Sequence, residues 1–311
     1  MSASPSWRHT VSGILLVMLC LSPISLISPV ARAEVVVLTS IKPLALIAEA
    51  VVGEQGRVSH LLPANASPHD YPLRVSDMQR LSGASLVLWV GPDLETFLRR
   101  PLANVPAERT MAVGELSGLN WPSEDEASIH TVGEHDHAHH HHEGRDPHLW
   151  LNPANAGVIA RALAERLAVV APEHAEQYRR QAMEWQSRWH ELDSELNKRL
   201  SRVRSRKFAV YHEGYRHFVA HYGLSQVAAV TLSPERRPGA RHLYELRETL
   251  RDARCLFTEP YYDMSAARDL ADEMGLSLGE MDLLGASEAI TSYQELLTGL
   301  TDAVVECLSP W

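Results

Sequence analysis

Short apolar runs rich in β-branched residues alternate with amphipathic segments along the first part of the chain. The runs at residues 35–39, 58–62 and 85–90 predict buried strands. Apolar positions at helical spacing predict helices at residues 43–52, 74–83 and 93–100. Strands that alternate with helices indicate parallel βαβ units, whose binding residues collect at the carboxyl ends of the strands.

The same alternation returns in the second half of the chain. Strands are predicted at residues 207–211, 226–231, 255–258 and 277–281. Helices are predicted at residues 215–222, 239–253, 265–275 and 292–308. Two stretches lie between the halves: an apolar helix at residues 153–170, and about thirty strong helix formers that run from Pro172 to about Arg204 without an internal Gly or Pro.

The pattern as a whole predicts an α/β fold of two lobes with parallel sheets. We expect an N-terminal lobe at residues 34–171, a long rigid linking helix at 172–204 and a C-terminal lobe at 205–311. A helix packed on one lobe alone is the alternative for the linking segment. Two bridged lobes leave a cleft between them, and a small ligand would bind there. A rigid link also favours small movements of the lobes.

Residues 1–33 have the features of a signal peptide. Arg8 and His9 provide a basic start, residues 13–21 form an apolar stretch too short to span a membrane, and Ala31 to Ala33 resemble a cleavage site. We therefore expect export to the periplasm, with cleavage near Ala33 and Glu34. Loss of this segment moves the formal net charge from −10 to −12, because it carries two arginines and no acid. The acidic balance disfavours nucleic acid as a partner and favours cations.

Seven histidines crowd into thirteen residues near the middle of the chain. They are His130, His135, His137, His139, His140, His141 and His142. Neutral imidazole binds zinc and other divalent metals, so this tract should bind metal weakly and without selectivity. The surrounding residues 122–145 contain little to bury, which predicts a disordered loop. An inert polar linker is the alternative.

Three other histidines stand in turn-rich settings that we expect to follow strands. His69, His148 and His212 belong to both predicted lobes and could converge on one ion at the sheet edges. Three imidazoles with a fourth ligand form a tetrahedral zinc site. Asp282, after the strand predicted at 277–281, is the candidate fourth ligand, and water is the alternative.

Two cysteines remain after the expected cleavage, Cys255 and Cys307. An exported protein permits a disulfide between them, which would tie the last helix to a strand of the second lobe. A pair of thiol ligands for metal is the alternative, although the spacing is unlike that of zinc sites.

At these residues the chain resembles a known family, the ZnuA type of periplasmic zinc-binding component of bacterial ABC importers. The resemblance spans the mature chain and rests on motifs that include Pro68-His-Asp-Tyr, the His-rich insertion, His148-Leu-Trp-Leu, His212-Glu-Gly-Tyr and Phe257-Thr-Glu-Pro. It implies zinc as the transported ligand, a membrane permease as the partner, and no catalytic activity. We expect a monomer.

The resemblance also assigns residues. It implies that His69, His148 and His212 are the histidine ligands and that Cys255 and Cys307 form a disulfide. Manganese-binding relatives have a carboxylate at the position of His212, so imidazole there favours zinc. Some zinc-binding members have a Glu before the first histidine, where this chain has Pro68.

Three other functions are weighed against this one. The first is import of manganese, nickel or iron, and the second is a periplasmic zinc buffer or adhesin without transport. The third is a zinc hydrolase, which would usually show two histidines four residues apart on a helix. Here His212 and His217 are five residues apart, which does not give a shared ligand face.

Overall fold

The computed structural model describes residues 34–309 except for 64–65, 124–144, 232–238 and 263. The expected signal peptide and the His-rich tract lie outside the described residues. From Glu34 onward the chain packs as one compact unit. In the described part of the chain, no helix is both long enough and apolar enough to cross a membrane.

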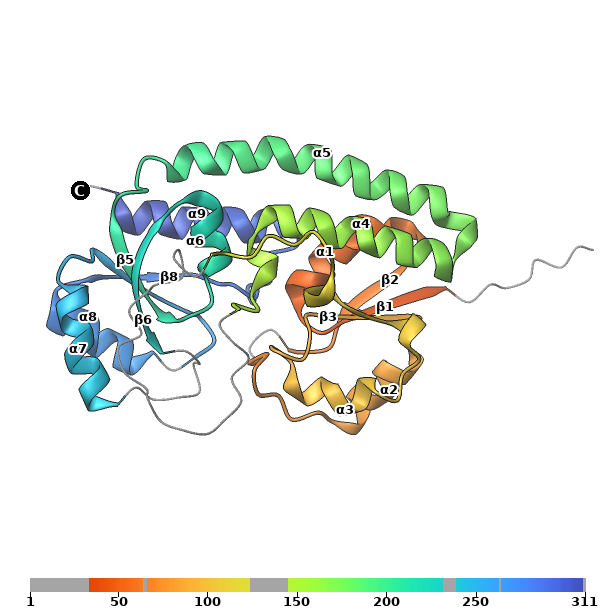
Figure 1. Ribbon diagram of the computed structural model, residues 1–311, viewed down its shortest axis with the longest axis horizontal. Coiled ribbons are helices and arrows are strands. Elements are labelled where there is room, and N and C mark those ends of the chain that lie inside the picture. The colour runs from red at the N-terminus through yellow and green to blue at the C-terminus, as the bar shows by residue number, and fades with distance from the viewer. Residues whose placement is uncertain (1–33, 64–65, 124–144, 232–238, 263, 310–311) are drawn as a thin grey trace, which may run out of the picture. The chain divides into compact units, whose positions relative to one another are not determined.

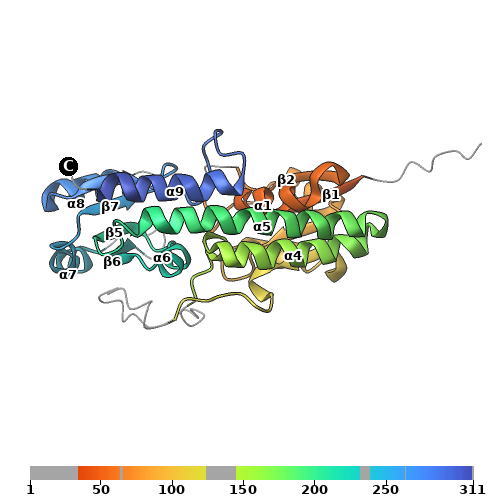
Figure 2. The ribbon, with the colours of Figure 1, turned by 90° about the horizontal axis from the view of Figure 1, so that it is seen from above.

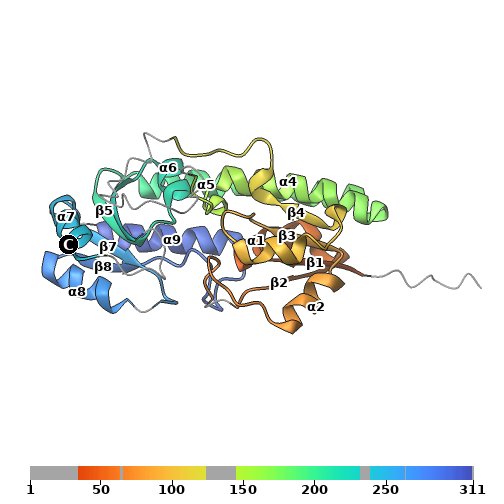
Figure 3. The ribbon, with the colours of Figure 1, turned by 60° about the horizontal axis from the view of Figure 1, so that its bottom comes forward.

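The first sheet is entirely parallel, with strand order β2-β1-β3-β4. Its strands are β1 (Val35–Thr39), β2 (Gly56–His60), β3 (Leu86–Trp89) and β4 (Thr110–Ala112). The helices that connect them are α1 (Lys42–Val52), α2 (Val75–Gly83) and α3 (Arg99–Leu102). Figure 3 shows this sheet with α2 near its edge strand β2. Three strands are where the sequence predicts them, while the three-residue strand β4 is too short to give a periodic signal.

The prediction of a helix at residues 93–100 is wrong. The chain forms a turn after Gly91, then the short 3-10 helix η2 (Thr96–Leu98), and only then α3. The carboxylate of Glu95 accepts the backbone N–H of Gly91 at 3.0 Å, which holds the segment in a turn instead of a helix.

The second sheet is also parallel, with strand order β6-β5-β7-β8. Its strands are β5 (Lys207–His212), β6 (Ser225–Thr231), β7 (Cys255–Thr258) and β8 (Ser277–Glu280). The helices are α6 (Arg216–Tyr222), α7 (Ala240–Leu250), α8 (Ser265–Met274) and α9 (Tyr293–Leu308). A disulfide joins Cys255 of β7 to Cys307 of α9, which confirms the pairing and excludes these thiols as metal ligands.

Two further helices, α4 (Pro153–Val170) and α5 (Ala175–Leu200), run beside each other in Figure 2. Helix α5 extends from the first lobe to the second (Figure 1) and is about 39 Å long at 1.5 Å per residue. It ends at Leu200, earlier than predicted. From there the short turns closed by Val203 and Arg206 lead the chain into β5.

One hydrophobic core runs through both lobes. Along β5, Phe208 and Val210 join the core that continues through α5 and α9 into the first lobe. The alternate residues Ala209 and Tyr211 pack into a smaller cluster with α7 and α8 on the other face of the sheet. Period-two alternation of a strand thus gives each face its own core. The shared core fixes the two lobes against each other.

Replacing Glu95 with Gln should remove a pH dependence of stability. Glu95 is completely buried, and burial raises its pKa from 4.5 to about 7. Between these pH values the unfolded chain has released the proton and the folded chain retains it, so stability falls as the pH rises. The fall due to this group is about 3 kcal/mol.

Denaturant unfolding of the wild-type and Glu95→Gln chains at pH 4.5, 6, 7 and 8 measures this effect. We expect the unfolding free energy of the wild-type chain to fall relative to that of the Gln variant as the pH rises to about 7. Above that pH the difference between the two chains should stay constant. A constant difference across these pH values would show that Glu95 does not titrate as burial requires.

Candidate metal centre

His212 is the last residue of β5, an inner strand of the second sheet. It is 2% exposed, and its position confirms that a histidine lies at the carboxyl end of a parallel strand. The buried run from Phe208 to Tyr211 places β5 in the core, and the chain leaves the sheet directly after His212.

His148 does not follow a strand, which corrects our expectation. It precedes the short 3-10 helix η5 (Leu149–Leu151), and Asn152 then caps α4 by accepting the N–H of Ala154 at 2.9 Å. Its neighbour Trp150 is buried and donates its indole N–H to the carbonyl of Leu283 in the second lobe at 2.9 Å. The His148 segment is thus fixed by contacts with both lobes.

His69 lies in the loop between β2 and α2 and is partly exposed. Its backbone N–H donates to the hydroxyl of Ser67 at 3.1 Å. Of the three histidines, it is the one at the surface of the site.

The three histidines converge. One ring nitrogen from each of His69, His148 and His212 lies within 4.8 Å of the other two, and the ring centroids are 5.1 to 5.3 Å apart. The Nε2 atoms of all three rings are buried and have no hydrogen-bond partner. An unpaired buried polar atom costs about 1–3 kcal/mol, and a metal ion at this point would remove that cost. No other group of this kind occurs among the residues that the structure describes.

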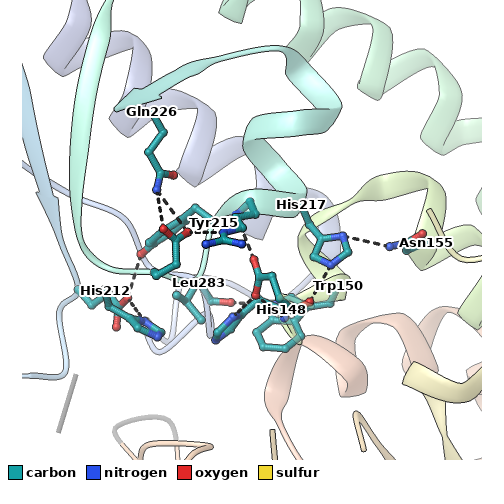
Figure 4. A network of polar contacts seen from close by, with 12 residues as sticks. His148, Trp150, Asn155, His212, Tyr215, His217, Gln226 and Leu283 are labelled. Carbon is teal, nitrogen blue, oxygen red and sulfur yellow. Dashed lines mark hydrogen bonds and ion pairs between the residues drawn. The ribbon is translucent and has the colours of Figure 1, made fainter. Parts of the chain in front are cut away.

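Two carboxylates fix the tautomers of the buried rings. Nδ1 of His148 lies 2.6 Å from Asp146, and Nδ1 of His212 lies 2.9 Å from Glu259. An ionised carboxylate only accepts, so each Nδ1 carries the proton and donates it to the carboxylate. Each Nε2 then has a free lone pair that points into the site. Figure 4 shows both imidazoles with these contacts. Such carboxylate–imidazole pairs orient metal ligands and make them more basic.

The charges around the site affect its ligands differently. Burial lowers the pKa of His69 well below its usual range, and the neighbouring imidazoles lower it further. Burial opposes protonation of His212 too, but the charge and hydrogen bond of Glu259, together with the charges of Asp146 and Glu213, outweigh burial and raise the pKa. Burial alone would raise the pKa of Asp146, but the imidazole and backbone N–H of His148 hold it low, which keeps this carboxylate ionised.

Asp146 also connects the site to helix α6. Its second carboxylate oxygen accepts the backbone N–H of Arg216 at 3.1 Å, and its carbonyl lies 2.9 Å from Nε2 of His217. His217 reaches Asn155 of α4 at 3.4 Å (Figure 4). His217 is therefore a structural partner of Asp146 and is not part of the three-histidine group.

Asp282 lies apart from the three imidazoles. It is not in the group of atoms that meet within 4.8 Å, and it lines a cavity of about 400 Å³ with Pro260, Glu280 and Ser287. Its Oδ2 accepts the backbone N–H of Ser287 at 3.1 Å, whereas its Oδ1 is buried without a partner.

Glu213, next to His212 in sequence, faces away from the site. Its carboxylate accepts the amide of Gln226 at 3.3 Å and lies 3.4 Å from the guanidinium of Arg216. Burial raises its pKa. These contacts give Glu213 a supporting role in the turn.

Sequence reasoning did not assign Asp146 and Glu259. Glu259 directly follows β7, and Asp146 stands two residues before His148. Carboxyl groups at the end of a strand and beside a candidate ligand are signals that could have found both residues.

Comparison with known proteins gives one consistent result. The sequence model of the family described as "Zinc-uptake complex component A periplasmic", ZnuA, matches residues 37–307. The high-affinity zinc uptake system protein ZnuA of Yersinia pestis is 34% identical over 92% of this chain and 95% of its own length. The protein of the same name from Haemophilus ducreyi is 31% identical over 91% and 96%.

Solved structures show the same fold. A crystal structure of ZnuA is similar with a TM-score of 0.74 and 23% identity, covering 89% of this chain and all of that one. A zinc-bound deletion mutant of ZnuA has the same TM-score and identity, with 90% of this chain and all of that one covered. The two-lobe arrangement predicted from the sequence is therefore confirmed.

Replacing Glu259 with Gln should weaken zinc binding and change its pH dependence. Loss of such a carboxylate partner typically costs 10–100-fold in metal affinity. Protons compete with metal for Nε2, and the raised pKa of His212 makes this competition begin above the usual pH of about 6.5. Without the charge of Glu259 that pKa falls, so the competition should begin at lower pH.

Chelator competition for zinc at pH steps from 8 to 5.5 tests both effects. The matched control is Glu184→Gln, which removes an exposed carboxylate of α5. We expect the control to behave like wild type. The role of Glu259 as the partner of a zinc ligand would be contradicted if the pH midpoint of zinc affinity were the same in Glu259→Gln as in wild type. It would also be contradicted if the zinc affinity of wild type did not change between pH 7.5 and 5.5.

Proposed function

The chain belongs to the ZnuA family of periplasmic zinc-uptake components, and we propose that it holds one zinc ion on the imidazoles of His69, His148 and His212. As a member of this family it is a periplasmic zinc-binding subunit of an ABC importer and not an enzyme. Zinc is the transported ligand. Proteins of this type work with a membrane permease and an ATPase.

The observation that carries the ligand assignment is the convergence of three imidazoles whose Nε2 atoms are all buried and without a hydrogen-bond partner. Carboxylates hold two of the rings with Nε2 free for a metal ion. Neutral imidazole suits zinc, while manganese prefers carboxylate oxygen. A set of three nitrogen donors therefore supports zinc as the cargo and argues against manganese.

We propose Asp282 as the fourth ligand, with water as the alternative. Its Oδ1 is buried and lacks a partner, so it is available to a cation. This oxygen lies outside the three-imidazole group, and it would have to move toward the ion when zinc binds.

Asp282→Asn tests the fourth ligand, because an amide oxygen carries no charge and binds zinc poorly. We expect zinc affinity to fall at least tenfold while the unfolding temperature of the zinc-free chain stays close to that of wild type. Zinc affinity equal to that of wild type would assign the fourth position to water.

We propose that the His-rich tract collects zinc beside the site. The described residues at its two ends are held together, since the guanidinium of Arg145 lies 5.1 Å from the ring centroid of Trp121. The ring of Trp121 also contacts His217 at 5.4 Å, next to Asp146. The described ends of the tract thus lie close to His148 in the chain, and zinc capture by the seven histidines between them, His130, His135, His137, His139, His140, His141 and His142, would raise the local zinc concentration.

Deletion of residues 130–142 should leave one tightly bound zinc ion, because the three-histidine site does not use this tract. His148→Ala in the same deletion variant should abolish tight binding. Zinc titration against a chelator measures both. Loss of tight binding on deletion alone would mean that the tract is the main site and that the three-histidine assignment is wrong.

We further propose that the signal peptide is removed near Ala33 and Glu34 and that the exported chain is a monomer. Intact mass and sedimentation of protein recovered from the periplasm test both statements.

A further inference from the structure

Gly214 lies in the turn between β5 and α6, against two of the proposed ligands. A Cβ atom on this residue would lie 3.0 Å from Cε1 and 3.2 Å from Nδ1 of His212. The same atom would lie 3.3 Å from Cε1 of His148. A single added methyl group would therefore press on both imidazoles at once.

Two hydrogen bonds hold the turn in place against these contacts. On one side of Gly214, the backbone N–H of Glu213 donates to the carbonyl of Thr231 on β6 at 2.9 Å. On the other side, the backbone N–H of Arg216 donates to Asp146 at 3.1 Å. Both anchors belong to the frame of the site, so displacement of the turn would disturb them too.

The imidazoles can yield only by disturbing their own contacts. Both rings are almost completely buried, and their Nδ1 atoms are hydrogen-bonded to Asp146 and Glu259. Cε1 is bonded directly to Nε2, so pressure on Cε1 displaces the atom that would bind metal. Sites for zinc require Zn–N distances of about 2.0–2.1 Å, held within about 0.2 Å.

Backbone conformation does not explain the glycine. Gly214 is absent from the glycines with positive φ, so no left-handed backbone conformation requires glycine at this position. What limits a side chain at position 214 is space, because the three atoms nearest to an added Cβ all belong to His148 and His212.

We propose that Gly214 is a positioning residue that sets the spacing of His148 and His212, and so the size of ion that the site accepts. This inference rests on the proposed three-histidine site. A side chain at position 214 would spread the two rings, which disfavours zinc and is better tolerated by a larger ion with the same ligand preferences.

Gly214→Ala in the full exported chain tests this inference. Chelator competition would be measured for Zn²⁺ and for the larger Cd²⁺ in the same preparations. We expect zinc affinity to fall about 10–100-fold, in the range seen when supporting residues of metal sites are changed, and cadmium affinity to fall less. The absorption spectrum of the Co²⁺-loaded chain should change as well, because it reports coordination geometry.

Gly83→Ala is the matched control. Gly83 is the exposed last residue of α2, and a Cβ there would meet nothing within 4 Å. This variant should bind both ions like wild type. His148→Ala is measured in parallel, because failure of that variant to lose tight zinc would refute the three-histidine site itself.

Two outcomes would overturn the role of Gly214 while leaving the site intact. The first is wild-type zinc affinity in Gly214→Ala, or an equal loss for Zn²⁺ and Cd²⁺. The second is a Gly214→Ala chain that stays unfolded at saturating zinc, which would show that the glycine serves the fold instead of the ligand spacing.

Discussion

Three buried imidazole nitrogens without hydrogen-bond partners are the constraint to which the rest of the structure responds. Each such atom lowers the stability of the folded chain by about 1–3 kcal/mol. The zinc-free chain can therefore keep three of them together only if the surrounding fold is stable. The shared core through β5, α5 and α9 provides that frame. Within this frame, Asp146 and Glu259 hold the rings of His148 and His212 and so keep their Nε2 lone pairs available.

The buried ligand His148 is fixed by contacts that cross between the lobes, whereas His212 is held by Glu259 within the second lobe. Trp150 reaches Leu283 through its indole, and the hydroxyl of Tyr293 donates to the carbonyl of Trp150 at 2.6 Å. Asp146 accepts from His148 on one side and from the start of α6 on the other. His69 is constrained least, since it is partly exposed and no carboxylate partner is found for it among the described residues. The site thus combines two fixed ligands with one ligand near the surface.

Much of this could be predicted from the sequence, because the signals were local. Strand β5 and its terminal His212 follow from a short apolar run that ends in a histidine, and α5 follows from its lack of Gly and Pro. Other features depend on where the turn before α6 lies in space, and the pattern of apolar residues does not contain that information. These features are the pairing of His148 with Asp146 and the proposed spacing role of Gly214. The error over residues 93–100 has the same origin, because the tertiary contact of Glu95 with Gly91 overrides a helical pattern.

The acids in this chain act in two separate ways. An excess of acidic residues gives the chain a net charge of −10, which attracts divalent cations over long distances and is screened by salt. Asp146 and Glu259 act only over the length of a hydrogen bond, and burial protects them from screening. Selectivity among metal ions must come from Asp146 and Glu259, because a diffuse negative charge attracts any divalent ion. Fixed tautomers and fixed ring spacing present nitrogen lone pairs at one point, and only an ion that prefers nitrogen at short distances gains from that arrangement.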